Sequence, residues 1–265
     1  MCSRKVVVGV AVFLLIVTAG VRADWHNWYG SGGVDQNWDN PLNWQYQTAP
    51  DPWDNPIVDT DLSGASKYPI LSSGNHNYFE VYVGWNNDGA MRMTGGTIAT
   101  DAGSWKGLAL GYNTAGKSGT LYMDGGTITV NSRMYLGNES GTWGGTTGII
   151  EMAGGTIYNN FMWEAMTLSG SSHIDLTGGT IDGERLLIKS SGAYVNITDT
   201  GKLILRHQNT GLLLTDIAGY IASNQIRGDN LQVAWDGNIV TITSIPEPAT
   251  MLLLGLGGLL FRRKK

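Results

Sequence analysis

The chain has 265 residues, of which 38 are glycine and only 15% are charged, and its formal net charge is −5. Three of its 17 Lys and Arg residues lie before residue 24 and four lie after residue 261, so ten cations face 22 acids in between, a net charge near −12. An acidic chain repels phosphate backbones, which argues against nucleic-acid binding, and the low charged fraction argues against a disordered polyelectrolyte.

The first 23 residues have the pattern of a secretory signal peptide. Arg4 and Lys5 form a short basic region, an apolar run follows over 6–17, and small residues precede the end of the segment. The run is short for a helix that crosses a bilayer, so removal is favoured over a permanent anchor. We expect signal peptidase to cut between Ala23 and Asp24.

Cysteine and histidine offer little metal chemistry in this chain. Its single cysteine, Cys2, lies in the segment predicted to be removed, so the exported part has no thiol and no disulfide. The four histidines are far apart in the sequence and lack ligand spacing: His26, His76, His173 and His207. We therefore expect no metal site and no cofactor.

Residues 24–77 form a predicted N-terminal cap that is rich in Trp and Pro. Five tryptophans lie in it: Trp25, Trp28, Trp38, Trp44 and Trp53. Their rings could close the open end of a folded stack, because large rings cover much apolar area. Alternatively, they could stack on the faces of sugars, which makes them the candidate glycan-binding residues. Two acidic pairs, Asp51 with Asp54 and Asp59 with Asp61, lack a complete calcium loop and are interpreted as turn residues.

A repeat occupies residues 78–198. The motif Gly-Gly-Thr-Ile occurs four times, with glycine pairs that begin at 95, 125, 154 and 178, so the spacings are 30, 29 and 24 residues. Apolar and polar residues alternate in the short pieces between the pairs, as Leu121 and Met123 show. Period-two alternation indicates strands with one buried face, and the glycines supply sharp corners.

Three short strands per repeat favour an all-β, right-handed parallel β-helix of about four to five coils with capping flanks. Each coil would bury its inner face only by stacking on its neighbours. The alternative is a β-sandwich or a propeller, but propeller repeats are longer, at about 40 residues. Stacking would align the threonines that follow each glycine pair: Thr97, Thr127, Thr156 and Thr180. Residues 199–244 are predicted to form end coils and a hairpin that turns at Asp236-Gly237.

Two possible catalytic patterns carry little weight. Residues 111–119 fit the Gly-x-x-x-x-Gly-Lys-Ser pattern of a phosphate-binding loop, but a strand pattern follows where a helix is required. Asp175, Asp182 and Glu184 are close in sequence and could suggest the paired carboxylates of a sugar-cleaving enzyme. Sequence spacing cannot show the separation that hydrolysis requires, so we expect a protein that is not an enzyme.

The last 21 residues, IPEPATMLLLGLGGLLFRRKK, combine a Pro-Glu-Pro triplet, a short apolar segment and a basic end. This tail resembles the PEP-CTERM sorting signal, with the triplet at Pro246, Glu247 and Pro248 and the basic end beginning at Arg262 and Arg263. The resemblance implies a short transmembrane helix, transient anchoring in the inner membrane and removal of the tail by an exosortase. The Gly-Gly-Thr-Ile region resembles the glycine-rich β-helical repeats of autotransporter-like surface proteins.

These features predict an exported protein that is secreted or held at the cell surface. Its expected role is structural or adhesive, in the cell envelope or an extracellular matrix, with extracellular polysaccharide as a partner besides the two processing proteases. A glycan-binding protein that uses the N-terminal tryptophans is the alternative, and a polysaccharide lyase or hydrolase is a weaker one.

Overall fold

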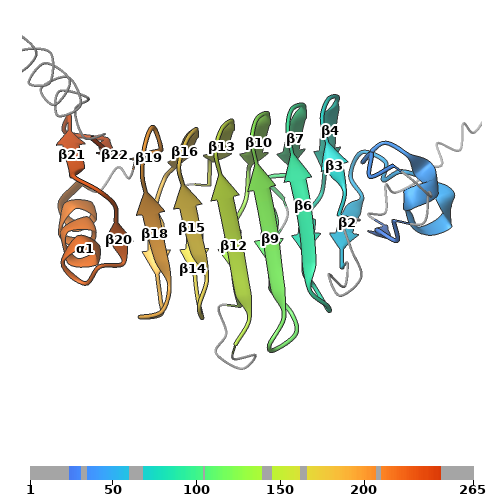
Figure 1. The fold of residues 1–265 in the computed structure, drawn as a ribbon, viewed down its shortest axis with the longest axis horizontal. Helices are drawn as coiled ribbons and strands as arrows, with labels where there is room; N and C mark the ends of the chain where they lie inside the picture. The colour runs from blue at the N-terminus through green and yellow to red at the C-terminus, as the bar shows by residue number, and fades with distance from the viewer. Residues whose placement is uncertain are drawn as a thin grey trace, which may run out of the picture.

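The structure is a computed structural model that describes residues 24–30, 35–59, 68–103, 105–138, 145–161, 166–206 and 210–245. Short strands form an elongated stack, which has the N-terminal segment at one end and a helix with a hairpin at the other (Figure 1). The predicted signal peptide, Asp61, His207 and residues 246–265 of the predicted sorting tail lie outside the described residues.

Three sheets form the walls of the stack. Sheet I contains β1 (Trp25–Asn27), β2 (Asn55–Val58), β5 (Val81–Val83), β8 (Leu108–Leu110), β11 (Met134–Leu136), β14 (Met166–Leu168) and β17 (Leu186–Ile188). Sheet II contains β3 (Ile70–Leu71), β6 (Gly89–Met93), β9 (Ser118–Met123), β12 (Thr147–Met152), β15 (His173–Leu176), β18 (Tyr194–Ile197) and β20 (Ile226–Arg227). Sheet III contains β4 (Asn75–Tyr78), β7 (Thr97–Thr100), β10 (Thr127–Val130), β13 (Thr156–Asn159), β16 (Thr180–Gly183), β19 (Lys202–Leu205), β22 (Val240–Ser244) and β21 (Leu231–Trp235).

From β2 to β19 the chain visits sheets I, II and III in turn and completes about six turns, which confirms the predicted β-helix. The prediction of four to five coils was low because strands in the flanks join the stack too. Their corners lack a glycine pair: the positive φ is adopted by Gly74 (+89°) between β3 and β4, and by Asp199 (+48°) between β18 and β19. Aspartate adopts a positive φ more often than most residues that have a side chain. A search for glycine pairs therefore misses these coils.

Successive coils are in register. Thr127 pairs with Thr97 on one side and with Thr156 on the other, and Thr156 pairs with Thr180. The predicted threonine row is therefore confirmed, and all pairings between these strands are parallel. Strand β22 pairs antiparallel with both β19 and β21. At the turn of the β21–β22 hairpin, the Asp236 carboxylate accepts hydrogen bonds from the backbone N–H groups of Asn238 and Ile239.

The glycine pairs are required by close approach between coils. The second glycine of each pair has a positive φ, for example +84° at Gly126 and +82° at Gly155. A Cβ on Gly155 would lie 2.7 Å from the carbonyl oxygen of Gly126 in the coil before. An L-residue with a side chain would therefore be both strained and in collision at this corner.

The core is a single column of aliphatic and Met side chains inside the three sheets, such as Leu121, Ile150 and Ile174 of sheet II. At the N-terminal end it is closed by Trp28, Trp38 and Trp44, whose rings meet edge to face at 5.1 and 4.9 Å. Two short 3₁₀ helices, η1 (Pro41–Asn43) and η2 (Gln45–Gln47), flank Trp44. At the other end, Ile217 of helix α1 (Thr210–Ala222) joins the core; this helix was not predicted within residues 199–244.

Candidate functional site

Sheet II carries a row of polar side chains on its outer face. Each of four strands places one residue three positions before its glycine pair, and a fifth strand continues the row; the residues are Arg92, Tyr122, Glu151, Asp175 and Asn196. Their neighbours along the strands, such as Ile150 and Met152, point into the core. Because side chains alternate between the faces of a strand, register alone brings these five residues side by side.

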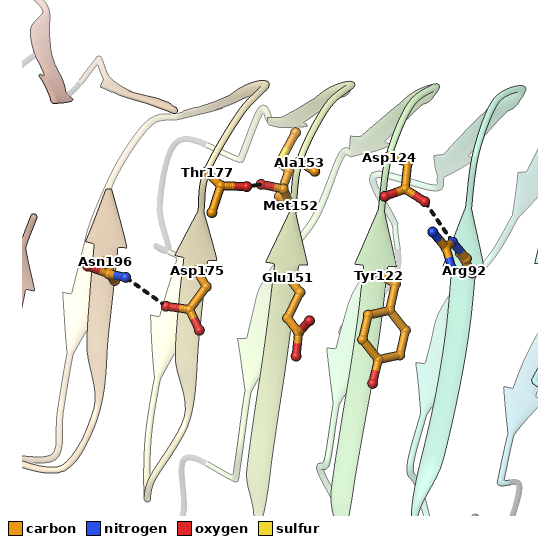
Figure 2. Close-up of a pocket in the computed structure, with 9 residues that line it drawn as sticks. All are labelled: Arg92, Tyr122, Asp124, Glu151, Met152, Ala153, Asp175, Thr177 and Asn196. Atoms are coloured by element: carbon orange, nitrogen blue, oxygen red, sulfur yellow. Dashed lines mark hydrogen bonds and ion pairs between the residues drawn. The ribbon is translucent and has the colours of Figure 1, made fainter. Parts of the chain in front are cut away.

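The row lines an open groove of about 730 Å³ that crosses five strands, as Figure 2 shows. Asp124, Ala153 and Thr177, one residue before their glycine pairs, form one border of the groove, where Thr177 Oγ1 donates to the backbone carbonyl oxygen of Met152 at 3.2 Å. Neighbouring parallel strands are about 4.8 Å apart, so the groove offers a new side chain at each such interval along the stack. We call this feature the sheet II groove.

An ion pair between Arg92 and Asp124 lies at one end of the sheet II groove. Arg92 Nε donates to Asp124 Oδ2 at 2.6 Å, from one coil to the next. Hydrogen bonds from Arg92 to Asp124 and Tyr68 raise the pKa of the guanidinium, so it stays charged. The Tyr68 ring lies 5.8 Å from the Tyr122 ring, which places an aromatic surface beside the pair.

The middle of the groove is acidic. Glu151 and Asp175 are register partners on adjacent strands, and both carboxylates extend from the same face (Figure 2). Within the described part of the chain, Glu151 has no hydrogen bond or ion pair. Burial first, and then the negative charge of Glu151, raise the pKa of the Tyr122 phenol, which keeps Tyr122 a neutral hydrogen-bond donor.

The far end of the groove is held by side-chain contacts. Asn196 Nδ2 donates to Asp175 Oδ1 at 3.1 Å, and His173 Nε2 lies 3.7 Å from Asp175 Oδ2. The His173 ring stacks on the Tyr194 ring at 4.9 Å, and the Arg227 guanidinium lies 3.5 Å from the centre of the same tyrosine. Asp175 is thus fixed in position, whereas Glu151 keeps its acceptor capacity free.

The five predicted glycan-binding tryptophans differ in how far they are buried. Trp28, Trp38 and Trp44 are almost completely buried; Trp38 Nε1 donates to Tyr78 Oη and Trp44 Nε1 to the Trp38 carbonyl, each at 2.7 Å. These three close the end of the core, as the plug interpretation expects. Only Trp25 and Trp53, each 46% exposed, have surface to offer to a ligand.

The two exposed tryptophans lie in different places. Trp25 stacks on Tyr82 at 5.4 Å, on the outer face of sheet I. Trp53 has a φ of +81° and borders a second pocket, of about 360 Å³, beside sheet III. Asn77, Thr100, Asp101 and Asn131 supply polar groups to that pocket.

One acid of each predicted pair, Asp54 and Asp59, has structural partners. The Asp54 carboxylate accepts hydrogen bonds from the backbone N–H groups of Asp24 and Asp51 and lies 3.1 Å from His26 Nε2, so it ties the start of the described chain to the first coil. Asp59 accepts from the backbone N–H groups of Trp85 and Asn86 in the next coil. No group of three or more potential metal ligands occurs among the described residues.

The predicted carboxylate group does not assemble. Asp182 lies on sheet III and pairs with Arg206 at 2.5 Å, whereas Asp175 lies on sheet II beside Glu151. The segment 111–119 leads into strand β9 rather than a helix, and Lys117 there lies 3.5 Å from Asp88. Neither arrangement has the geometry of the enzyme that its pattern suggested.

Sequence reasoning missed the sheet II groove, although a signal for it was present. Aligning the repeats on their glycine pairs places Arg92, Tyr122, Glu151 and Asp175 at one position, in the outward phase of each strand. An aromatic cluster on the outer face of sheet I was not predicted either. There the rings of Trp85 and Tyr112 stack with their centres 5.7 Å apart, and Lys106 Nζ lies 4.9 Å from the centre of the Tyr112 ring. Tyr82 and Tyr135 are buried beneath these side chains.

Comparison with known proteins identifies one segment of this chain. Residues 244–265 match the PEP-CTERM protein-sorting motif. No curated protein and no solved structure matches the chain. In the part of the chain that the structure describes, no helix is both long and apolar enough to cross a membrane. The motif indicates a protein that is exported, anchored transiently in the membrane and processed by an exosortase.

Proposed function

We propose that this protein is a non-enzymatic structural or adhesive component of the cell envelope or extracellular matrix, and that its β-helix holds extracellular polysaccharide. The observation that carries the proposal is the sheet II groove, which repeats one outward side chain per coil across five coils. A polymer of repeating units can bind such a surface along its length, and many weak contacts then add up.

The groove chemistry suits adhesion to a sugar chain. Glu151 and Asp175 are register partners that extend from one face, and Asp175 accepts a hydrogen bond from Asn196 at 3.1 Å. The carboxylates, amide and hydroxyl groups that line the groove can form hydrogen bonds with the hydroxyl groups of a polysaccharide.

The proposal is tested by fractionating cultures of the producing cells. We expect the protein to co-purify with the extracellular polysaccharide, with an intact mass that lacks residues 1–23 and the apolar tail. Deleting the gene should weaken cohesion of the matrix without changing the length of its polysaccharide chains. Shorter polysaccharide in cells that carry the gene would indicate an enzyme and contradict the proposal.

The pocket bordered by Trp53, beside sheet III, supports a second glycan-binding site. Trp53 presents an exposed ring beside the amides of Asn77 and Asn131, which suits a sugar face together with its hydroxyl groups. Trp53→Ala should then reduce retention by polysaccharide, whereas Trp105→Ala, a change at a tryptophan that is 72% exposed and lines neither pocket, should not.

A further inference from the structure

We propose that the sheet II groove selects a linear glycan whose sugars carry free amino groups, and that Glu151 and Asp175 bind the ammonium groups. The proposal deepens the proposed function and rests on it, because it names the polymer that the groove holds. Two observations support it. The first is the charge of the groove, and the second is that the strands beneath it are already paired on both edges.

The groove has unbalanced negative charge. The Arg92 guanidinium pairs with Asp124 at 2.6 Å, so the charges of these two lining residues offset each other. Arg227, the register partner of Asn196, lies over the Tyr194 ring and does not line the groove. Two carboxylates, Glu151 and Asp175, then lie side by side in register. Like charges directly opposite each other destabilise a sheet, and a cationic ligand between them relieves that repulsion. A polyuronate would increase it.

The remaining lining suits a sugar. Tyr122 and Thr177 carry hydroxyl groups, Asn196 carries an amide, and Glu151 has free acceptor capacity, so the groove matches the donors of a polyhydroxylated chain. The Tyr122 ring provides an aromatic surface on which the apolar face of a sugar can lie. The net charge near −12 of residues 24–261 attracts a cationic polymer from a distance.

A basic peptide fits this surface less well than an amino-sugar chain. Strands β9, β12 and β15 are internal strands of sheet II, paired on both edges. A peptide therefore cannot add as a further strand here, and its backbone groups would find few partners. A glycan has no peptide backbone to satisfy and needs only side-chain contacts.

The test is calorimetric titration of the purified exported protein with four probes: a glucosamine hexamer, its N-acetylated counterpart, a uronic acid hexamer and hexalysine. We expect the glucosamine hexamer to bind most tightly, with an affinity that falls as salt is added, and the uronic acid hexamer not to bind. The double variant Glu151→Gln, Asp175→Asn should weaken glucosamine binding by about tenfold, since each exposed charge contact contributes modestly.

Asp216→Asn, on helix α1 and away from the groove, is the matched control and should leave binding unchanged. The double variant should melt no lower than the unmodified protein, because it removes repulsion. Equal binding of the glucosamine and N-acetylated hexamers, no effect of the double variant, or equally tight binding of hexalysine would overturn the inference. If polysaccharide retention in cultures survives such a result, the proposed function stands and only the choice of polymer fails.

Discussion

At the scale of single residues, glycines act through close approach between coils. Gly119 on β9 shows this without any positive φ: a Cβ there would lie 1.9 Å from the Val83 carbonyl oxygen and 2.4 Å from the Gly111 nitrogen. Both contacts are with backbone atoms, which cannot rotate away. Gly219 in α1 is the opposite case, since a Cβ there meets nothing within 4 Å.

We therefore expect Gly119→Ala to lower the free energy of unfolding by about 3 kcal/mol through overpacking. Gly219→Ala should raise it by about 0.5 to 1 kcal/mol, because alanine favours an exposed helix. Urea titrations of the two variants measure the difference. Similar midpoints for both would mean that the coils are not packed as closely as the structure shows.

Asp59 makes stability depend on pH. Burial is the main influence and raises the pKa of this carboxyl above its ordinary value of 3.8, despite hydrogen bonds from the backbone of Asn86 and Trp85. An acid whose pKa is higher in the folded state binds its proton more tightly there. Its contribution to stability is therefore fully present below pH 3.8 and is lost as the pH rises through the folded-state pKa.

Asp59→Asn cannot ionise, so the stability of this variant relative to the unmodified protein should increase as the pH rises from 3 to 7. Thermal midpoints across this range measure the trend, and Asp229→Asn, an exposed change, is the control. A relative stability that falls over this range would show that the charged form of Asp59 is the favoured one.

At the scale of elements, sheet I differs from the other walls because its outer face is also covered. Tyr135 on β11 points outward, yet it is 3% exposed beneath Tyr112 and its neighbours. Tyr158 on β13 also points outward and is 40% exposed. The same residue type thus occupies two outer faces with different burial.

Tyr135→Ala should lower the free energy of unfolding by about 3 to 4 kcal/mol, the cost of emptying a buried aromatic site. Tyr158→Ala should change it by less than about 1 kcal/mol, as exposed substitutions do. Denaturant midpoints of this matched pair test the expectation. Equal losses would mean that the aromatic cluster contributes no more than an exposed ring.

At the scale of the whole molecule, the stack behaves as a one-dimensional array. Each coil contacts only its neighbours, so stability accumulates toward the middle and the ends open first. Strands β9 and β12 have coils on both sides, whereas β1 and β21 are the terminal strands of their sheets.

Hydrogen exchange should therefore be slowest for the amides of β9 and β12 and fastest for those of β1 and β21. Mass spectrometry of peptic fragments resolves these segments. A single exchange rate across all strands would instead indicate that the molecule opens only as a whole.

The sequence by itself determined the β-helix. Two local signals recur in each repeat. Apolar and polar residues alternate along strands such as 118–123, and a glycine pair follows the strand. The sorting motif is likewise a continuous segment, over 244–265. Local patterns could not reveal the coils that turn at Gly74 and Asp199, because those corners use one residue with positive φ in place of a pair.

Only the tertiary structure decided which outward side chains meet. Asp175 lies beside Glu151, 24 positions earlier, because the register between stacked strands decides which residues are neighbours. It does not lie beside Asp182, seven positions later, because the chain turns a corner between them and Asp182 belongs to a different sheet. The same applies to the tryptophans: three close the core and two are half exposed, and nothing in their spacing distinguishes them. The physical reason is that burial and contact across coils depend on the packing of segments far apart in the chain.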